Sequence, residues 1–395
     1  MSSKIQQFIK SHFSNEIKDA TPTFSPKSRG FINTLYHAIL EAEQSWNKTR
    51  KGLITGSPIT TSSSNYVPSH IPYPDIKTMP MMKSNYSFTV LSRTVSVEMA
   101  HPPASEAQIV GFFQDAIHKI YMWIYVATKF AAASCSKAMS VHLYFTDYTK
   151  TLSKTREATP LNPVHVNTAF TTACAPSTEI FLFRKEEWFK VFIHETFHNL
   201  GLDFSSMDNS NINTMVSKIF PVTGDIRLYE TYCEMWAEIM NALFVSVLST
   251  QKAKDHETTV MRKFRTMLGF ESVFSVFQCV KILEHYGLTY HDMTILERRS
   301  VGLKKYKEET YILSYYIIKS IFMTHVNDFV EWCLDHNGAT LDFKKTSTNA
   351  ADFVRLITEL YKTPKHLELV EFVKKVDLSG VDNFIRDTLR MTVFG

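Results

Sequence analysis

The pattern of apolar and polar positions divides the chain into a part that carries strands and a longer part that is helical. Apolar residues at alternate positions are typical of half-buried strands, and apolar residues three or four positions apart are typical of amphipathic helices. Strands are predicted over residues 86–100, 140–146, 164–172 and 179–183. Helices are predicted twice within residues 1–50, the second over 26–48, and over 105–134, 188–201, 225–248, 273–285, 305–322, 327–334, 351–361, 367–376 and 381–389. The sequence therefore predicts an α+β fold whose C-terminal part is mostly helical.

The composition changes between residues 51 and 85, where Ser, Thr and Pro are frequent. Proline removes backbone donors and blocks helix formation, so this stretch is predicted to be a linker or an extended strap. It separates an N-terminal helical appendage, residues 1–50, from a core over residues 86–250. Residues 251–395 are predicted to form a helical C-terminal subdomain.

The overall composition excludes several classes of protein. Hydrophobic residues make up 44% of the chain and aromatic residues 13%, which is enough for a large core and argues against disorder. The net charge is only +4, and there is no block of Lys or Arg, so a nucleic-acid partner is not expected. Residues 117–134 are the most apolar run, but His118, Lys119 and Lys129 interrupt it, which favours a buried helix over a membrane span. No feature indicates an oligomeric state.

The cysteines and the N-terminus bear on the compartment. The five cysteines are odd in number, scattered, and contain no C-x-x-C pair. This usage favours a reducing compartment and predicts neither a disulfide framework nor a cysteine zinc finger. The first residues, MSSKIQQFIKSHF, lack the apolar run of a secretory signal. A cytoplasmic location is therefore expected.

The stretch WFKVFIHETFHNLG contains His194, Glu195 and His198 in the order H-E-x-x-H. On a helix, residues four apart share one face, so both imidazoles can reach one ion while Glu195 can meet a water on that ion. Two nitrogen ligands from a rigid element and an adjacent carboxylate base are what a zinc hydrolase needs. The alternative is a pair of histidines satisfied inside an apolar core.

Two histidines leave a catalytic zinc site one protein ligand short. In the metzincin arrangement the third ligand follows the glycine by three residues, and here that position is Phe204, which cannot bind a metal. Asp203 is a displaced substitute. The metzincin interpretation therefore fails at this position.

A helix over residues 225–248 offers another ligand, with Asp225 as its expected N-cap. Glu230, Glu234 and Glu238 are spaced at i, i+4 and i+8, so their carboxylates form one row on an otherwise apolar helix. Burying such a row is costly unless a cation faces it. The alternative is a solvent-exposed acidic stripe.

At this point the sequence resembles the gluzincins, the thermolysin-like zinc peptidases. In that family a second helix supplies a Glu, followed by a small residue at the third position and an acidic residue at the fourth, and EMWAE at residues 234–238 matches this pattern. The resemblance implies that Glu234 is the third ligand and that Glu238 holds an imidazole N–H, that of His194. Glu230 is the reserve candidate. The resemblance also implies a zincin-like core, with a small mixed sheet, the H-E-x-x-H helix and the Glu helix.

The resemblance extends upstream of the histidines. Gluzincins use an edge strand to bind peptide through backbone groups, and residues 165–170 are the candidate strand, which makes Asn167 and Ala169 substrate-binding candidates. The series of motifs over residues 140–246 looks like the metallopeptidases encoded by nucleocytoplasmic large DNA viruses. This implies a virus-encoded protein that acts in infected cytoplasm or travels in the particle.

The predicted function is that of a zinc metallopeptidase, in which Glu195 is the general base toward a zinc-activated water and the substrate is a peptide or protein. Gluzincins add a His or Tyr that stabilises the oxyanion, and the sequence offers several candidates: His285, Tyr286, His291, Tyr311, Tyr315 and Tyr316. Two alternatives stay open. One is a non-catalytic structural or virion-associated protein on a zincin scaffold, and the other is a proenzyme that residues 1–85 occlude.

Overall fold

The computed structural model describes residues 2–50, 55–152, 159–250 and 255–395. The chain divides into two compact units. We call them the sheet unit, Ile32–Thr149 and Asn167–Leu202, and the helical unit, Met1–Phe31, Lys150–Val166 and Asp203–Gly395. Helices and strands both occur in quantity, so the prediction of an α+β chain is confirmed in this coarse sense.

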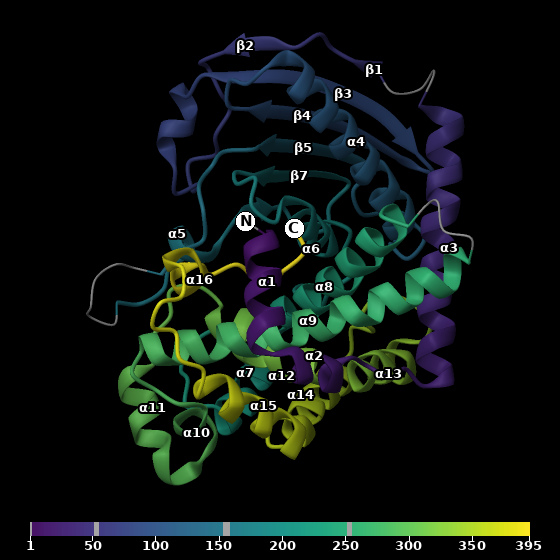
Figure 1. Ribbon diagram of the computed structural model, residues 1–395. Helices are drawn as coiled ribbons and strands as arrows, with labels where there is room; N and C mark the ends of the chain where they lie inside the picture. Colours follow the sequence, from purple (N-terminus) through teal and green to yellow (C-terminus); the bar gives the residue numbers. More distant parts are fainter. Residues whose placement is uncertain (1, 51–54, 153–158, 251–254) are drawn as a thin grey trace. The chain divides into compact units, whose positions relative to one another are not determined.

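The sheet unit is built on a seven-stranded mixed sheet (Figure 1). Its strands run in the order β1-β3-β4-β5-β7-β6, and β2 also pairs with β3. β4, β5 and β7 are parallel, whereas β3 and β6 run antiparallel to their neighbours. The elements of this unit are α3 (Pro26–Thr49, which begins in the helical unit), β1 (Thr55–Gly56), β2 (Thr60–Ser62), η1 (Pro74–Thr78), β3 (Met81–Val90), β4 (Arg93–His101), α4 (Glu106–Thr128), β5 (Ala138–Tyr144), β6 (Ala169–Thr171), β7 (Ser177–Leu182) and α6 (Trp188–Asn199).

Alternation along the strands separates the two faces of the sheet. In β4, Val95, Val97 and Met99 are buried on one face while the residues between them are more exposed. Helices α4 and α6 pack on this apolar side, where the ring of Tyr121 on α4 lies 5.5 Å from that of Phe88 on β3. This packing holds α6, the helix with the H-E-x-x-H sequence, against β6 and β7.

The stretch predicted to be a linker or strap contains regular elements where it is described; residues 51–54 lie outside the described residues. β1 and β2 extend the sheet beside β3. Val67, Ile71 and Ile76 are buried in one cluster with Tyr144 and Phe181, which lie on the face of the sheet opposite α4. These three side chains of the stretch therefore belong to the core of the sheet unit.

Several predicted elements differ from those observed. The strand predicted over 86–100 is a hairpin of β3 and β4, which turns at Leu91 with φ +51°. The strand predicted over 164–172 is a short helix, α5, followed by the three-residue β6. Residues 1–50 form three helices, and the segment after Gly201 contains α7. Asp225 does not cap the helix predicted from it, because α8 begins at Leu228.

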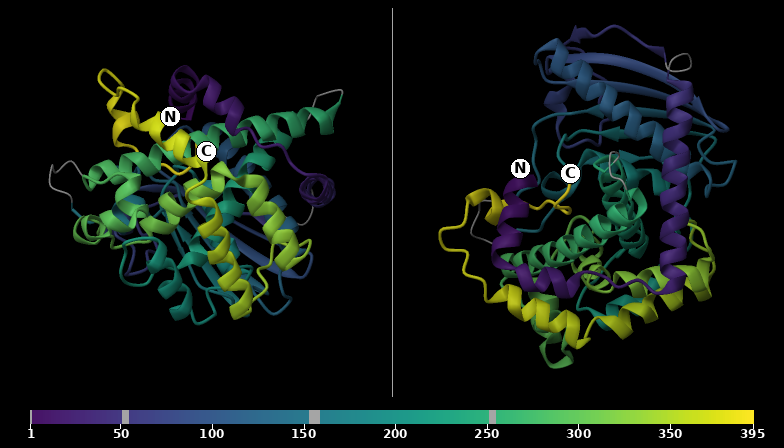
Figure 2. Two further views of the ribbon diagram at one scale, coloured as in Figure 1. Left: turned by 90° about the horizontal axis from the view of Figure 1, so that it is seen from below. Right: turned by 45° about the vertical axis from the view of Figure 1, so that its right-hand side comes forward.

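The helical unit is packed around α9, which is buried over most of its length (Figure 2). α1, α2, α8, α12 and α15 all contact it. Its elements are α1 (Ser2–His12), α2 (Ser14–Ala20), α5 (Pro163–Val166), α7 (Ser210–Ile219), α8 (Leu228–Leu248), α9 (His256–His285), α10 (Tyr290–Thr294), η2 (Leu296–Arg298), α11 (Arg299–Lys305), the π-helix η3 (Leu313–Ile318), α12 (Lys319–Thr324), α13 (Val326–Asn337), α14 (Ser347–Leu360), α15 (Pro364–Lys374) and α16 (Asn383–Asp387). By length and composition alone α9 would suffice to cross a membrane, but 89% of its most apolar window is buried in the fold.

Candidate metal centre

The helix α6 brings His194 and His198 together. Their Nε2 atoms are 3.3 Å apart and their rings meet nearly edge to face, with centroids 5.1 Å apart. Two nitrogens bound to one tetrahedral ion at about 2.05 Å are separated by about 3.3 Å, so the pair fits a shared zinc ion. His194 is 7% exposed, whereas His198 and Glu195 are half-buried, as an accessible metal and its base require.

The rotation of α6 about its axis is fixed by a buried hydrogen bond. The indole N–H of Trp123 on α4 donates to the hydroxyl of Thr196, and that hydroxyl donates to the carbonyl of Ile193 at 2.7 Å. Both Trp123 and Thr196 are fully buried. Because Thr196 lies between the two histidines in sequence, this bond sets the direction in which the imidazoles point.

The C-terminal end of α6 is anchored by a second polar network. The Oδ1 of Asn199 accepts hydrogen bonds from the hydroxyls of Ser136 at 2.6 Å and Thr178 at 3.1 Å. Ser136 also donates to the carbonyl of Asn199 at 2.7 Å. The network fixes the residue that directly follows His198 to β7 and to the loop before β5.

A disulfide bond joins Cys135 to Cys174, beside the glycine that ends α6. Gly201 has φ +66°, and a Cβ on it would lie 3.0 Å from the Cβ of Cys174. The expectation that the cysteines form no disulfide was wrong. The two residues are 39 positions apart in sequence, and only the pairing of β5 with β7 brings them together.

The carboxylate row on α8 is buried. Glu230 is 6% exposed, Glu234 1% and Glu238 0%, so the alternative of a solvent-exposed stripe is wrong. Lys319, 2% exposed on α12, faces the row: its Nζ lies 3.2 Å from Oε1 of Glu234 and 2.6 Å from Oε2 of Glu238. Sequence reasoning expected a cation opposite these carboxylates, but it did not identify this one.

The electrostatics of this group follow from its burial. Burial opposes the charge on Lys319, but Glu238 and Glu234 outweigh it, so the pKa of the ammonium is raised above its usual value. Burial, and then the charge of Glu238, raise the pKa of Glu271 well above its ordinary value. Lys319 therefore faces Glu234 and Glu238 as an ammonium. Glu234, the predicted zinc ligand, is thus engaged with an ammonium.

Glu230 has a different partner. The hydroxyl of Tyr315, on the π-helix η3, donates to its Oε2 at 3.1 Å. The π-helix is capped by Glu308, whose carboxylate accepts from the N–H of Leu313 at 2.8 Å. π-Helical segments occur frequently at functional sites.

The remaining oxyanion candidates have structural partners. The hydroxyl of Tyr286 accepts from the N–H of Leu161 at 3.0 Å, and an imidazole nitrogen of His285 lies 3.2 Å from the carbonyl of Thr159. The hydroxyl of Tyr316 donates to the carbonyl of Leu389 at 2.6 Å. His291 lies 3.6 Å from the carboxylate of Glu371, and Tyr311 packs against Tyr315 with ring centroids 6.1 Å apart.

The side chains that could take part in holding a metal ion, among the described residues, are His194, His198, Asp203, Glu230 and Cys233. Asp203 and Cys233 are buried neighbours, with Sγ 3.8 Å from Oδ2. The sequence contained a signal for Glu230, because ETYCE at residues 230–234 repeats the spacing of EMWAE one turn earlier, with Cys233 as the small residue. Reading the pattern in that register makes Glu230 the candidate ligand.

The predicted substrate-binding strand is observed in part. Ala169 lies in β6 and pairs with Leu182 of β7, at the end of the strand order. Asn167 precedes the strand. The ring of Phe170, 41% exposed, packs 3.9 Å from that of His70 in the strap.

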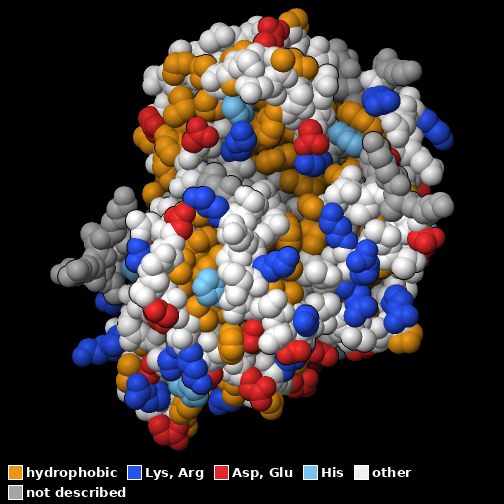
Figure 3. Space-filling model, viewed as in Figure 1, with side chains coloured by type: hydrophobic (Ala, Val, Ile, Leu, Met, Phe, Trp, Pro, Cys, Tyr) orange, Lys and Arg blue, Asp and Glu red, His pale blue; other side chains and the backbone are white. Residues whose placement is uncertain are grey.

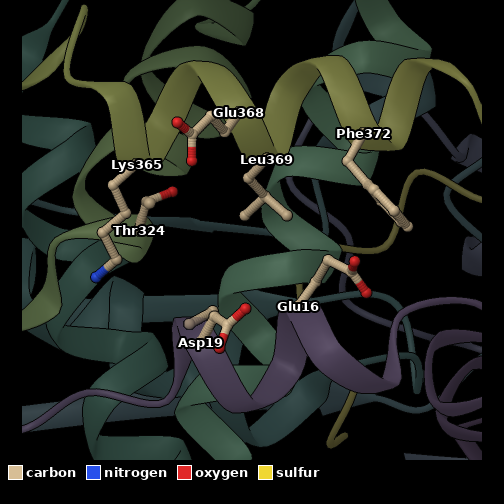
Figure 4. Close-up of a pocket in the computed structure, with 8 residues that line it drawn as sticks. Glu16, Asp19, Thr324, Lys365, Glu368, Leu369 and Phe372 are labelled. Atoms are coloured by element: carbon tan, nitrogen blue, oxygen red, sulfur yellow. The ribbon is translucent and has the colours of Figure 1, made fainter.

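Two further hollows lack the chemistry of a catalytic centre. One, of about 230 Å³, lies between α2 and α15, where Glu16 and Asp19 face Glu368 and Phe372 (Figure 4). The other, of about 420 Å³, lies over β3, β4 and β5, and its lining includes several serines together with Glu98 and His142. On the surface of the helical unit, Lys and Arg side chains are mixed with Asp and Glu side chains (Figure 3).

Comparison with known proteins gives no relative. No family model, curated protein or solved structure matches this chain.

Proposed function

We propose that the chain is a zinc-dependent metallopeptidase with a zincin-like core. The observation that carries the proposal is the convergence of His194 and His198 on one point of a buried, twice-anchored helix, with Glu195 half-buried beside them. A neutral His pair in a core would not need the intervening carboxylate, which is the general base of a zinc hydrolase.

We further propose Glu230 as the third zinc ligand, in place of Glu234. Carboxylate ligands of zinc bind through a charged oxygen, and an ammonium close to that oxygen both competes for it and repels the ion. The ammonium nitrogen of Lys319 lies 3.2 Å from Oε1 of Glu234. The hydroxyl that Tyr315 donates to Oε2 of Glu230 is a neutral group. The chemistry of this donor set, two imidazoles and one carboxylate, is that of a catalytic zinc site.

When bound, zinc supplies a Lewis acid that polarises a peptide carbonyl and lowers the pKa of water toward about 7. Glu195 accepts a proton from the attacking water and delivers it to the leaving amine nitrogen. The hydrogen bond from Trp123 to Thr196 keeps the helix in the rotation that this transfer needs. Because β6 stands at the end of the strand order, we propose that its backbone, including Ala169, pairs with an extended peptide, and that Asn167, which precedes the strand, also contacts it.

Metal analysis combined with peptide hydrolysis tests the proposal. The purified protein should contain one zinc per chain, His198→Ala and Glu230→Gln should lose it, and Glu234→Gln should keep it. Glu195→Gln should keep the metal and lose hydrolysis of a peptide library. If the wild-type chain binds zinc and cleaves no peptide, the non-catalytic scaffold is the better description; if it binds no zinc, the metal site is refuted.

A further inference from the structure

The hydroxyl of Tyr315 is committed to Glu230 in the structure, at 3.1 Å from Oε2. An ionised carboxylate only accepts hydrogen bonds, so the phenol is the donor, and a phenol has a single O–H to donate. That proton is therefore engaged by Glu230 and is not directed at a substrate oxygen. This geometry differs from the oxyanion role that the sequence suggested for Tyr315.

We propose that Tyr315 is a positioning residue that holds the carboxylate of Glu230 in the orientation for metal binding. This inference rests on the proposed function. A hydrogen bond on one oxygen of a glutamate restricts its terminal torsion, and such outer partners orient ligands and tune their basicity. Without this hydrogen bond the carboxylate is flexible, and the entropy that it loses on ordering weakens the binding of the ion.

The backbone on both sides of this pair is fixed. Next to Glu230, the hydroxyl of Thr231 donates to the carbonyl of Ser314 at 3.1 Å, next to Tyr315. The hydroxyl of Ser314 in turn donates to the carbonyl of Ile226 at 2.8 Å, just before α8. Thr231 and Ser314 are both 0% exposed, so these bonds lie in the core.

One turn further along, the same two helices meet again. Lys319 follows Tyr315 by four residues, and Glu234 follows Glu230 by four, and the two are joined at 3.2 Å. The carboxylate row and the chain from η3 to α12 therefore run in register, with a hydroxyl opposite the first carboxylate and an ammonium opposite the next. The register explains why the first carboxylate has a neutral partner that orients it.

Tyr311 provides a matched control for the experiment. It lies one turn before Tyr315, is likewise half-buried, and packs its ring under the guanidinium of Arg227 at 4.5 Å. Replacing Tyr311 by Phe removes a hydroxyl from the same region and retains the ring on which Arg227 lies.

The test compares Tyr315→Phe, Tyr311→Phe and Glu230→Gln in the full chain. Zinc affinity is measured by competition with a chelator, the ligand field by the visible spectrum of the cobalt-substituted protein, and kcat and KM at saturating zinc. Tyr315→Phe should weaken zinc binding about 10–100-fold, alter the cobalt spectrum, and recover most of its kcat when zinc saturates. Tyr311→Phe should change the zinc affinity and the cobalt spectrum far less than Tyr315→Phe.

The outcomes separate this inference from the proposed function. If Tyr315→Phe keeps wild-type zinc affinity and cobalt spectrum while kcat falls, Tyr315 acts on the oxyanion and the positioning role is overturned alone. If Glu230→Gln keeps wild-type zinc affinity, Glu230 is not a ligand, and both the proposed ligand set and this inference are overturned. Far-ultraviolet circular dichroism of each variant confirms that the fold is intact before the comparison.

Discussion

Replacing Lys319 by Met removes a buried positive charge that the structure places against both Glu234 and Glu238. All three side chains are at most 2% exposed. Removing one partner of a buried ion pair costs about 3–5 kcal/mol, because the charge that remains is desolvated without compensation. The backbone carbonyl of Met391, which accepts from Lys319 at 2.6 Å, also loses its donor. We therefore expect Lys319→Met to lower the free energy of unfolding by about 3–5 kcal/mol at pH 8.

Urea unfolding followed by tryptophan fluorescence measures this loss, and its pH dependence gives the mechanism. Acid neutralises carboxylates, so the deficit of Lys319→Met should shrink between pH 8 and pH 5. Adding Glu238→Gln should recover part of the deficit, because one of the uncompensated charges is removed. Lys345→Met, which breaks an exposed pair with Asp342, is the matched control and should change stability by less than about 1 kcal/mol. A Lys319→Met loss below about 1 kcal/mol, or one that Glu238→Gln does not relieve, would refute the reasoning.

Three further predictions concern other parts of the fold. Gly201→Ala should destabilise the chain by about 1–3 kcal/mol, because φ is +66° at this position. The control Gly111→Ala lies inside α4 with nothing within 4 Å of the added Cβ, so it should be neutral or slightly stabilising. Thermal unfolding compares the two, and equal effects would contradict the prediction. Changing Cys135 and Cys174 to Ser together should lower the free energy of unfolding by about 2–4 kcal/mol, and a reductant should destabilise the wild type but not this variant; free-thiol titration of all five cysteines in the native protein would contradict the disulfide. Burial raises the pKa of Glu308 to about 7 from its ordinary value of 4.5. Between these two pH values the folded state binds more protons than the unfolded state, so the free energy of unfolding should fall by up to about 3 kcal/mol as pH rises. Glu308→Gln should flatten this dependence in urea titrations from pH 4 to 8, and an unchanged slope would refute it.

Local patterns were sufficient for the elements that a short stretch of sequence determines. The helix α6 was predicted to within two residues at its C-terminal end, because its apolar residues recur at helical spacing and Gly201 supplies the left-handed residue that ends it. The strand β5 was predicted because its apolar residues alternate, and β7 was predicted from a short run of apolar residues. The β3–β4 hairpin was missed, since alternation continues through its turn and Leu91 occupies a position where Gly or Asn is usual.

The features that were missed depend on contacts between distant parts of the chain. The disulfide between Cys135 and Cys174 requires the pairing of two strands, which the spacing of the cysteines does not reveal. Lys319 lies 81 residues after Glu238, and its apolar neighbours (YYII before it, SIFM after it) indicate burial but do not identify its partner. The register of the acidic row was ambiguous because acidic residues at every fourth position satisfy the same motif twice.

A row of buried carboxylates on an apolar helix needs compensation, and the sequence argument assigned all of it to one metal ion. The structure supplies an ammonium to the second and third members of the row, Glu234 and Glu238, and a hydroxyl to the first, Glu230. Glu230 also lies in the first turn of α8, where the helix dipole favours a negative charge. In the proposed site, ligand and structural roles are divided along one helix. It follows that Glu230→Gln should affect zinc binding far more than stability, whereas Glu234→Gln should lower stability by about 2 kcal/mol and leave zinc in place; the reverse pattern would return the ligand to Glu234.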